Sequence, residues 1–215
     1  MQFQIDPKFS ELGMAVHLGV LDYAVSVTDT PDELKTAMEE ACELRQQELM
    51  GEAASSDPVI AAVRRAFKAT GKDPSRYRPS SEALTRRVIA GKGLYFVNNV
   101  VDAGNLVSLM TGVPVGCYDA AWIKGDLSLR IGTPGETYDG IGRGGINLEG
   151  LPVLADMDGP FGSPFSDSDR TGVSEQTRDL VFVLYGLNMD VAHVEAAAEI
   201  SDALITRYCT SNTNS

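Results

Sequence analysis

The sequence predicts a mixed α/β fold: one compact domain in which mixed sheets are flanked by helices. Residues 13–27 (GMAVHLGVLDYAVSV) are apolar and β-branched, which is typical of a strand. Residues 179–186 (DLVFVLYG) are almost wholly apolar and predict a buried, central strand. Helical periodicity occupies much of the chain between 30 and 91 and returns between 189 and 208. Because no repeat or low-complexity linker interrupts the chain, residues 1–215 are expected to form a single domain.

Three helices are expected in the first half of the chain. Each is signalled by a capping residue, in two cases with a proline directly after it. Gly71 and Gly91 are expected to end the second and third helices, since glycine tolerates the backbone of a helix C-terminus. The expected N-caps are, in order, Thr30, Asp57, and Ser80 or Ser81.

From residue 94 onward the pattern changes to short strands and turns. A short helix is expected over 105–110, capped by Asp102 or Asn105. Residues 157–171 are expected to form a long loop, and such loops are uncommon in compact domains unless they are functional. The expected strands are 95–97, 126–130, the end of 135–140, and 152–156.

Composition excludes several classes of protein. The three cysteines, Cys42, Cys117 and Cys209, form no CxxC pair, so neither a disulfide framework nor a zinc site is indicated. The start MQFQIDPKF lacks the layout of a signal peptide, and no apolar run approaches the roughly 18–20 residues that span a bilayer. No GxSxG or HExxH motif is present. A cytoplasmic, soluble, reduced protein is therefore expected, with no membrane partner, metal or cofactor.

Basic residues are concentrated in one segment. The chain has a net charge of −12, yet nine of its 18 Lys and Arg residues lie between Arg64 and Lys92, opposed only by Asp73 and Glu82. Such an island can bind a phosphate backbone, or it can be a set of solvated helix faces paired with acids from elsewhere. The candidate RNA-binding residues are Arg64, Arg65, Lys68, Arg76, Arg78, Arg86 and Arg87.

Residues 98–130 contain more polar residues than a plain core would accept. Asp102 and Asn105 flank Ala103-Gly104, and a tight turn then leads to the segment Gly116 to Asp119. Buried carboxylates and amides need partners, so this stretch is either a polar scaffold or one wall of a pocket. The segment GIGRGG (140–145) has the glycines of a phosphate loop, but no long buried strand precedes it and no helix follows, which disfavours that interpretation.

Several motifs, in one order, carry a family resemblance. The span from about residue 62 to 186 resembles free-standing relatives of the editing module formed by the third and fourth domains of the phenylalanyl-tRNA synthetase beta subunit. The resemblance implies a family-like core over 62–186, preceded by a strand–helix part (1–61) and followed by the helix over 189–208. The motifs are RPSSEALTRR (78–87), NNVVDAGNLVSLMTGVPVGCYD (98–119), LRIGTPGETYDGIG (129–142), VLAD (153–156) and GPFGSPFSDSDRT (159–171).

The resemblance also implies a function. The family hydrolyses tyrosine wrongly attached to phenylalanine tRNA, so a trans-acting aminoacyl-tRNA deacylase is expected. A non-enzymatic module that binds RNA or a small amino-acid-like ligand, and a purely structural domain, remain alternatives. The family's Asn is matched by Asn105, and its Asp by Asp119, while Gly104 and Gly116 replace its Thr and His.

The site residues follow from that comparison. An acidic residue in a late loop recognises the amino acid in the family, and either Asp167 or Asp169 corresponds to it. The expected catalytic positions are Asn105 and Gly116, and the expected substrate-binding positions are Gly104, Cys117, Ser163, Asp167, Ser168 and Arg170.

Overall fold

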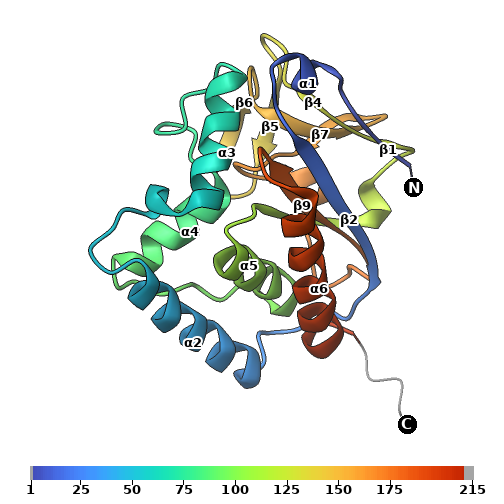
Figure 1. Ribbon diagram of the computed structural model, residues 1–215. Helices are drawn as coiled ribbons and strands as arrows, with labels where there is room; N and C mark the ends of the chain where they lie inside the picture. Colours follow the sequence, from blue (N-terminus) through green and yellow to red (C-terminus); the bar gives the residue numbers. More distant parts are fainter. Residues whose placement is uncertain (1, 211–215) are drawn as a thin grey trace.

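The computed structural model describes residues 2–210, in which most helices lie in the first half of the chain and most strands in the second (Figure 1). The helices are α1 (Lys8–Glu11), α2 (Asp32–Glu48), α3 (Pro58–Ala69), α4 (Ser80–Ile89), α5 (Asn99–Thr111) and α6 (Val191–Tyr208). The strands are β1 (Phe3–Ile5), β2 (Val16–Ala24), β3 (Val115–Asp119), β4 (Leu127–Ile131), β5 (Thr137–Gly140), β6 (Gly144–Asn147), β7 (Pro152–Asp156), β8 (Gly159–Gly162) and β9 (Asp179–Leu187). Three short 3₁₀ turns are η1 (Ala54–Ser56), η2 (Ala120–Trp122) and η3 (Asp169–Thr171).

The strands form three sheets. A four-stranded sheet has the order β1-β4-β7-β8, with β1 parallel to β4 and the other pairs antiparallel. A three-stranded antiparallel sheet has the order β2-β9-β3, and β5 and β6 form a separate hairpin. The mixed α/β class predicted from the sequence is confirmed, and β9 is the central strand that its apolar run predicted.

The sheet β2-β9-β3 is the middle layer. Glycines allow helices to pack closely on one side of it. A Cβ at Gly19 or Gly186 of the sheet would contact Val194 of α6, and a Cβ at Gly104 of α5 would lie 2.8 Å from the Cys117 sulfur of the sheet. Its other side faces β8, where the rings of Tyr118 and Phe161 meet edge to face with centroids 4.9 Å apart. Figure 1 shows α5 and α6 side by side with β9 beside α6.

The helix starts only partly follow the predicted caps. Asp57 caps α3, since its Oδ1 accepts from the backbone N–H groups of Val59 and Ile60. Thr30 does not cap α2; its hydroxyl donates to Asp102 Oδ2 instead, at 2.5 Å. Ser80 and Ser81 do not cap α4 either, because helix α4 begins at Ser80 itself, after Pro79. The capping signals predicted where the helices lie, but the Thr30 hydroxyl binds the carboxylate of Asp102, which is distant in the sequence, instead of capping α2.

The stretch from 95 to 119 differs most from expectation. Residues 95–97 form no strand, and the predicted short helix over 105–110 is the end of the longer α5. Asn98 is its N-cap, accepting from the Val101 N–H at 2.9 Å. Gly112 ends it in the left-handed conformation at φ +73°. The prediction placed the cap too late because Asp102 and Asn105 also suit a first helical turn.

Residues 157–171 are more ordered than the predicted loop. They contain β8 and η3, and the backbone N–H of Ser168 donates to the Phe161 carbonyl. The segment GIGRGG lies at the β5–β6 hairpin, with Gly140 paired to Gly144. It therefore lacks the strand–loop–helix context of a phosphate loop.

Candidate functional site

A cluster of tyrosines surrounds one carboxyl group, Asp167, at the interface of β3, β9 and the segment after β8. The Tyr118 hydroxyl donates to Asp167 Oδ1 at 2.6 Å, and it lies 2.6 Å from the Tyr185 hydroxyl. The Ser163 N–H adds a longer contact to Oδ1 at 3.4 Å. The other oxygen, Oδ2, accepts no hydrogen bond from the described residues, and the Asp167 side chain is partly buried. Oδ2 is therefore the carboxyl oxygen without a protein partner among residues 2–210.

The surroundings change the acidity of this carboxyl group. Burial raises the pKa of Asp167 to about 7, although the hydrogen bonds from Tyr118 and Ser163 act in the opposite direction. Burial also raises the pKa of the Tyr118 and Tyr185 hydroxyls well above their usual range, and the neighbouring carboxylate adds to this. At neutral pH the tyrosines are protonated donors, and both the protonated and the ionised form of Asp167 are populated. Such a group is suited to general base catalysis.

Gly116 is a glycine because Tyr118 occupies the space beside it. Residues 116 and 118 lie on the same side of β3, and a Cβ at Gly116 would overlap the Tyr118 hydroxyl. Gly162 on β8 closes the other side, since a Cβ there would overlap the same hydroxyl. The family resemblance implied a histidine at the position of Gly116; such a side chain cannot fit while Tyr118 occupies this space.

Replacing Gly116 by alanine is expected to destabilise the protein by about 2 kcal/mol, because overpacking forces the Tyr118 ring to move. Chemical denaturation measures the loss. Gly145→Ala is the matched control, since nothing lies within 4 Å of a Cβ at that position. In a Tyr118→Ala background the alanine at 116 has room and should cost much less. An equal cost in both backgrounds would contradict this account.

The two predicted catalytic positions, Asn105 and Gly116, lie in different surroundings. Asn105 lies partly exposed on α5, and among the described residues its side chain has no hydrogen bond. Gly104 and Cys117 are in contact on the helix-facing side of the sheet, whereas Gly116 faces β8. Burial raises the pKa of the Cys117 thiol, so this cysteine is protonated and is a poor nucleophile.

The predicted substrate-binding residues of the late loop, other than Asp167, each make contacts within the protein. The Ser163 hydroxyl donates to the Ser166 carbonyl at 2.8 Å and accepts from Tyr138, so it fixes the turn that presents Asp167. Ser168 caps η3 by accepting from the Arg170 N–H. The Arg170 guanidinium binds both oxygens of Asp156, at 2.9 and 3.1 Å. These contacts hold the segment in place around Asp167.

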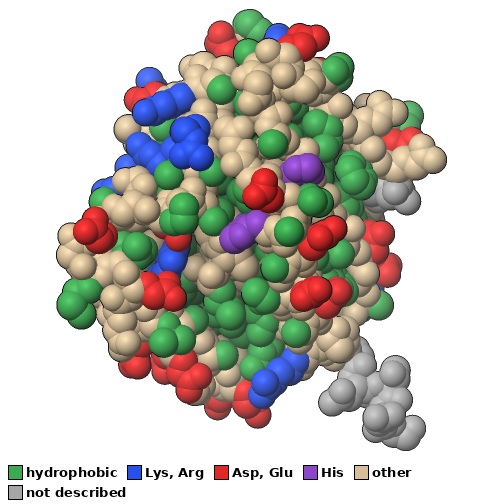
Figure 2. Space-filling model, in the orientation of Figure 1, with side chains coloured by type: hydrophobic (Ala, Val, Ile, Leu, Met, Phe, Trp, Pro, Cys, Tyr) green, Lys and Arg blue, Asp and Glu red, His purple; other side chains and the backbone are tan. Residues whose placement is uncertain are grey.

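The basic segment divides into two groups. Arg64 and Arg78 contact Glu82, which is only 1% exposed, with N–O distances of 2.6 and 3.6 Å. The Arg87 guanidinium lies over the Tyr95 ring at 5.3 Å. The remaining four candidates are exposed and form no ion pair within residues 2–210. These are Arg65, Lys68, Arg76 and Arg86. In Figure 2, Lys and Arg side chains gather at the upper left, over the region of α3.

The other polar residues of 98–119 are scaffold. Buried Asp102 accepts from Thr30 and from the Val97 N–H, and Asp119 accepts from Thr177 at 2.7 Å and from the Ala121 N–H. Burial raises the pKa of Asp102, while these hydrogen bonds lower it. Asn99 connects its helix to two other backbone segments, through Ser26 and Thr28 in one and Tyr208 in the other.

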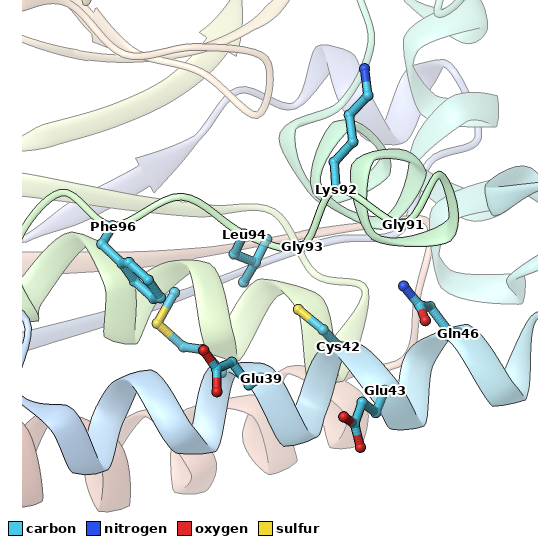
Figure 3. A pocket seen from close by; sticks show the side chains of 10 residues that line it. Glu39, Cys42, Glu43, Gln46, Gly91, Lys92, Gly93, Leu94 and Phe96 are labelled. Carbon is cyan, nitrogen blue, oxygen red and sulfur yellow. The ribbon is translucent and has the colours of Figure 1, made fainter.

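A cavity lies apart from this cluster, between α2 and the segment after α4. Figure 3 shows Cys42, Glu39, Glu43 and Gln46 of α2 facing the chain from Gly91 to Phe96. Its volume is about 440 Å³. Burial raises the pKa of the Cys42 thiol, so the cavity offers no activated nucleophile. None of the residues expected at the site line it.

Sequence reasoning missed the three tyrosines of the cluster, Tyr118, Tyr138 and Tyr185. Each lies in a strand as an ordinary core aromatic, and no local pattern relates them to Asp167. The one available signal was the pair of glycines, Gly116 and Gly162, which in strands mark a close approach of another group.

Two features are absent from residues 2–210. No group of three or more His, Cys, Asp or Glu side chains in that range is arranged to hold a metal ion. No helix there is long and apolar enough to cross a membrane.

The fold and the site define an α/β domain in which a partly exposed carboxyl group lies on a loop beside a basic surface. The family model described as "B3/4 domain" matches residues 62–210. The chain therefore belongs to the B3/4 domain family.

Its curated relatives are beta subunits of phenylalanine–tRNA ligase. The chain is 32% identical to that of Brucella abortus over 105 residues, covering 48% of this chain and 13% of the relative. It is 31% identical to that of Mycoplasma pneumoniae over 111 residues, covering 51% of this chain and 14% of the relative. The matched part is thus less than a fifth of either relative.

One solved structure is similar in part. It is an N-terminal fragment of the phenylalanyl-tRNA synthetase beta subunit from Pyrococcus horikoshii, with 18% identity and a TM-score of 0.46. The match covers 52% of this chain and 40% of that one.

Proposed function

We propose that this chain hydrolyses the ester of mischarged aminoacyl-tRNA in trans, with Asp167 as the general base. The observation that carries the proposal is the Asp167 carboxyl group itself: Oδ1 accepts from Tyr118, Oδ2 has no partner among the described residues, and burial raises its pKa to about 7. Such a group can accept a proton from water or from a ribose hydroxyl at neutral pH. Membership of the B3/4 domain family and the relatives' names support tRNA as the substrate.

The location of Asp167 also supports this function. Its loop contacts the basic segment, because the Ser80 N–H of α4 donates to the Pro164 carbonyl at 2.8 Å. The exposed basic residues of that segment are available to bind phosphates. They are Arg65, Lys68, Arg76 and Arg86. Tyr118 donates to Asp167 Oδ1, and Oδ2 has no partner among the described residues, so Oδ2 is the oxygen that would accept the proton.

The test is to incubate the protein with a panel of mischarged tRNAs and to follow the loss of the amino acid. The wild-type protein should hydrolyse at least one ester. Asp167→Asn, which keeps an acceptor for Tyr118, should lower the rate by about 100-fold or more. Asp169→Asn, in the same loop but exposed, is the matched control and should retain the rate.

The pH profile tests the same role. Only the deprotonated carboxylate is a base, so kcat/KM should rise with pH up to about 7 and then level off. No hydrolysis on any tRNA, or an unchanged rate in Asp167→Asn, would overturn the proposal. Binding of tRNA without hydrolysis would instead support the non-enzymatic RNA-binding module.

A further inference from the structure

An open cavity of about 330 Å³ lies where the connection between α3 and α4 meets the β5–β6 hairpin. Two aromatic rings and two guanidinium groups line it, together with the exposed end of the hairpin. It is distinct from the tyrosine cluster but adjoins it, since Phe165 precedes Asp167 by two residues. The lining residues are Arg76, Tyr77, Arg143, Gly145, Ile146, Asn147 and Phe165.

The aromatic rings form a small platform. Tyr77 and Phe165 meet edge to face, with centroids 5.3 Å apart and an interplanar angle of 62°. The Arg143 guanidinium carbon lies 5.0 Å from the centroid of Phe165, and that of Arg76 lies 5.7 Å from the centroid of Tyr77. Both rings are partly exposed. Each ring therefore pairs with a planar cation at the surface.

The two guanidinium groups are available for a ligand. Arg76 and Arg143 are exposed, and their side chains form no ion pair or hydrogen bond with any described residue. Buried Lys72, by contrast, is fully engaged: its ammonium donates to the Asn147 and Glu149 carbonyls at 3.0 and 2.6 Å and lies over the Tyr77 ring. Lys72 fixes the wall of the cavity, while the two arginines are free to bind.

We propose that this cavity binds an unpaired nucleotide of RNA, whose base stacks on Phe165 or Tyr77 and whose phosphate pairs with Arg76 and Arg143. Unpaired bases are commonly held on aromatic rings and guanidinium planes. Every charged residue of the lining is positive, which favours a phosphate. An acidic peptide would pair with the arginines but would place no base on the aromatic rings.

This inference rests on the proposed function only for the identity of the RNA. The nucleotide would lie beside the loop that carries Asp167, so a strand bound here would bring its neighbouring groups toward that carboxylate. The inference also assigns a phosphate-binding role to Arg143. This residue lies in the β5–β6 hairpin, whose glycines resembled a phosphate loop, but here its side chain would bind the phosphate.

The experiment measures binding of a fluorescently labelled single-stranded RNA 8-mer by anisotropy at several salt concentrations. Phe165→Leu should weaken binding about tenfold, with the salt dependence unchanged. Arg143→Ala should weaken binding and lower the slope of log K against log salt by about one charge. The matched control is Arg207→Ala on α6, whose guanidinium also lies over an aromatic ring, Tyr208, at 5.0 Å. It should bind as the wild type does.

A duplex of the same sequence separates stacking from charge, because its bases are already stacked. It should bind more weakly than the single strand, and Phe165→Leu should not affect it. Three results would overturn the inference. RNA binding could fall as much in Arg207→Ala as in the cavity variants, or both cavity variants could bind RNA as the wild type does. A polyglutamate peptide could also bind as tightly as the single-stranded RNA. Thermal unfolding of each variant checks that it is folded.

The two proposals can fail separately. If Phe165→Leu and Arg143→Ala lose RNA binding while no tRNA is hydrolysed, the cavity binds RNA and the deacylase function is wrong. If hydrolysis occurs and depends on Asp167 but these two variants bind RNA normally, the deacylase stands and the cavity has no role in RNA binding.

Discussion

Replacing Glu82 by alanine is expected to lower the free energy of unfolding by about 3 kcal/mol. Glu82 is the only acid of the basic segment that is buried, and its carboxylate contacts Arg64 and Arg78. Removing it leaves two guanidinium groups facing each other in a poorly solvated site. The loss is at the low end for a buried pair because both arginines retain some exposure, 21% and 36% of their side chains.

Urea denaturation measures this loss, with Glu82→Gln as an intermediate variant that keeps the shape and one acceptor. Glu199→Ala, an exposed helical position on α6, is the matched control and should change stability by less than about 0.5 kcal/mol. A loss below about 1 kcal/mol in Glu82→Ala would mean that the two arginines do not depend on this carboxylate. They would then rejoin the exposed basic residues as candidates for phosphate binding.

Asp167→Asn is expected to stabilise the protein at alkaline pH by about 3 kcal/mol and to have little effect below about pH 4. The folded-state pKa of Asp167 is raised from 3.8 to about 7, so between these values the folded state binds more protons than the unfolded state. Stability is therefore lost as pH rises through this window. Asparagine resembles the protonated carboxyl group and removes the loss.

The measurement is the difference in unfolding free energy between the variant and the wild type across that range of pH. The difference should grow as pH rises and level off above about 7. Asp169→Asn, at an exposed position, should give a difference that does not vary with pH. A destabilisation of Asp167→Asn that is equal at both ends of the range would show that the pKa of this carboxyl group is not raised in the folded state. If the expected results are obtained, the same variant separates catalysis from folding, because it loses activity while it gains stability at alkaline pH.

The elements predicted correctly are those with strong local signals. The apolar run of β9 and the Asp57 cap of α3 each follow from residues that are neighbours in the chain. The basic segment was also visible in the sequence, but the burial of Glu82 was not, and burial decides which arginines remain free. The strand β3 was missed because its five residues include a glycine and end in an aspartate.

The sequence by itself determined the class of the fold, most of its helices and strands, and the segments that surround the candidate site. Only the tertiary structure decided what those segments do. Tyr118 and Asp167 are 49 positions apart, and Thr30 and Asp102 are 72 apart, yet each pair shares a hydrogen bond. A buried polar group takes the nearest partner in space, whatever its distance along the chain. For that reason the tyrosine that excludes a side chain from position 116 and holds Asp167 emerged only when three strands came together.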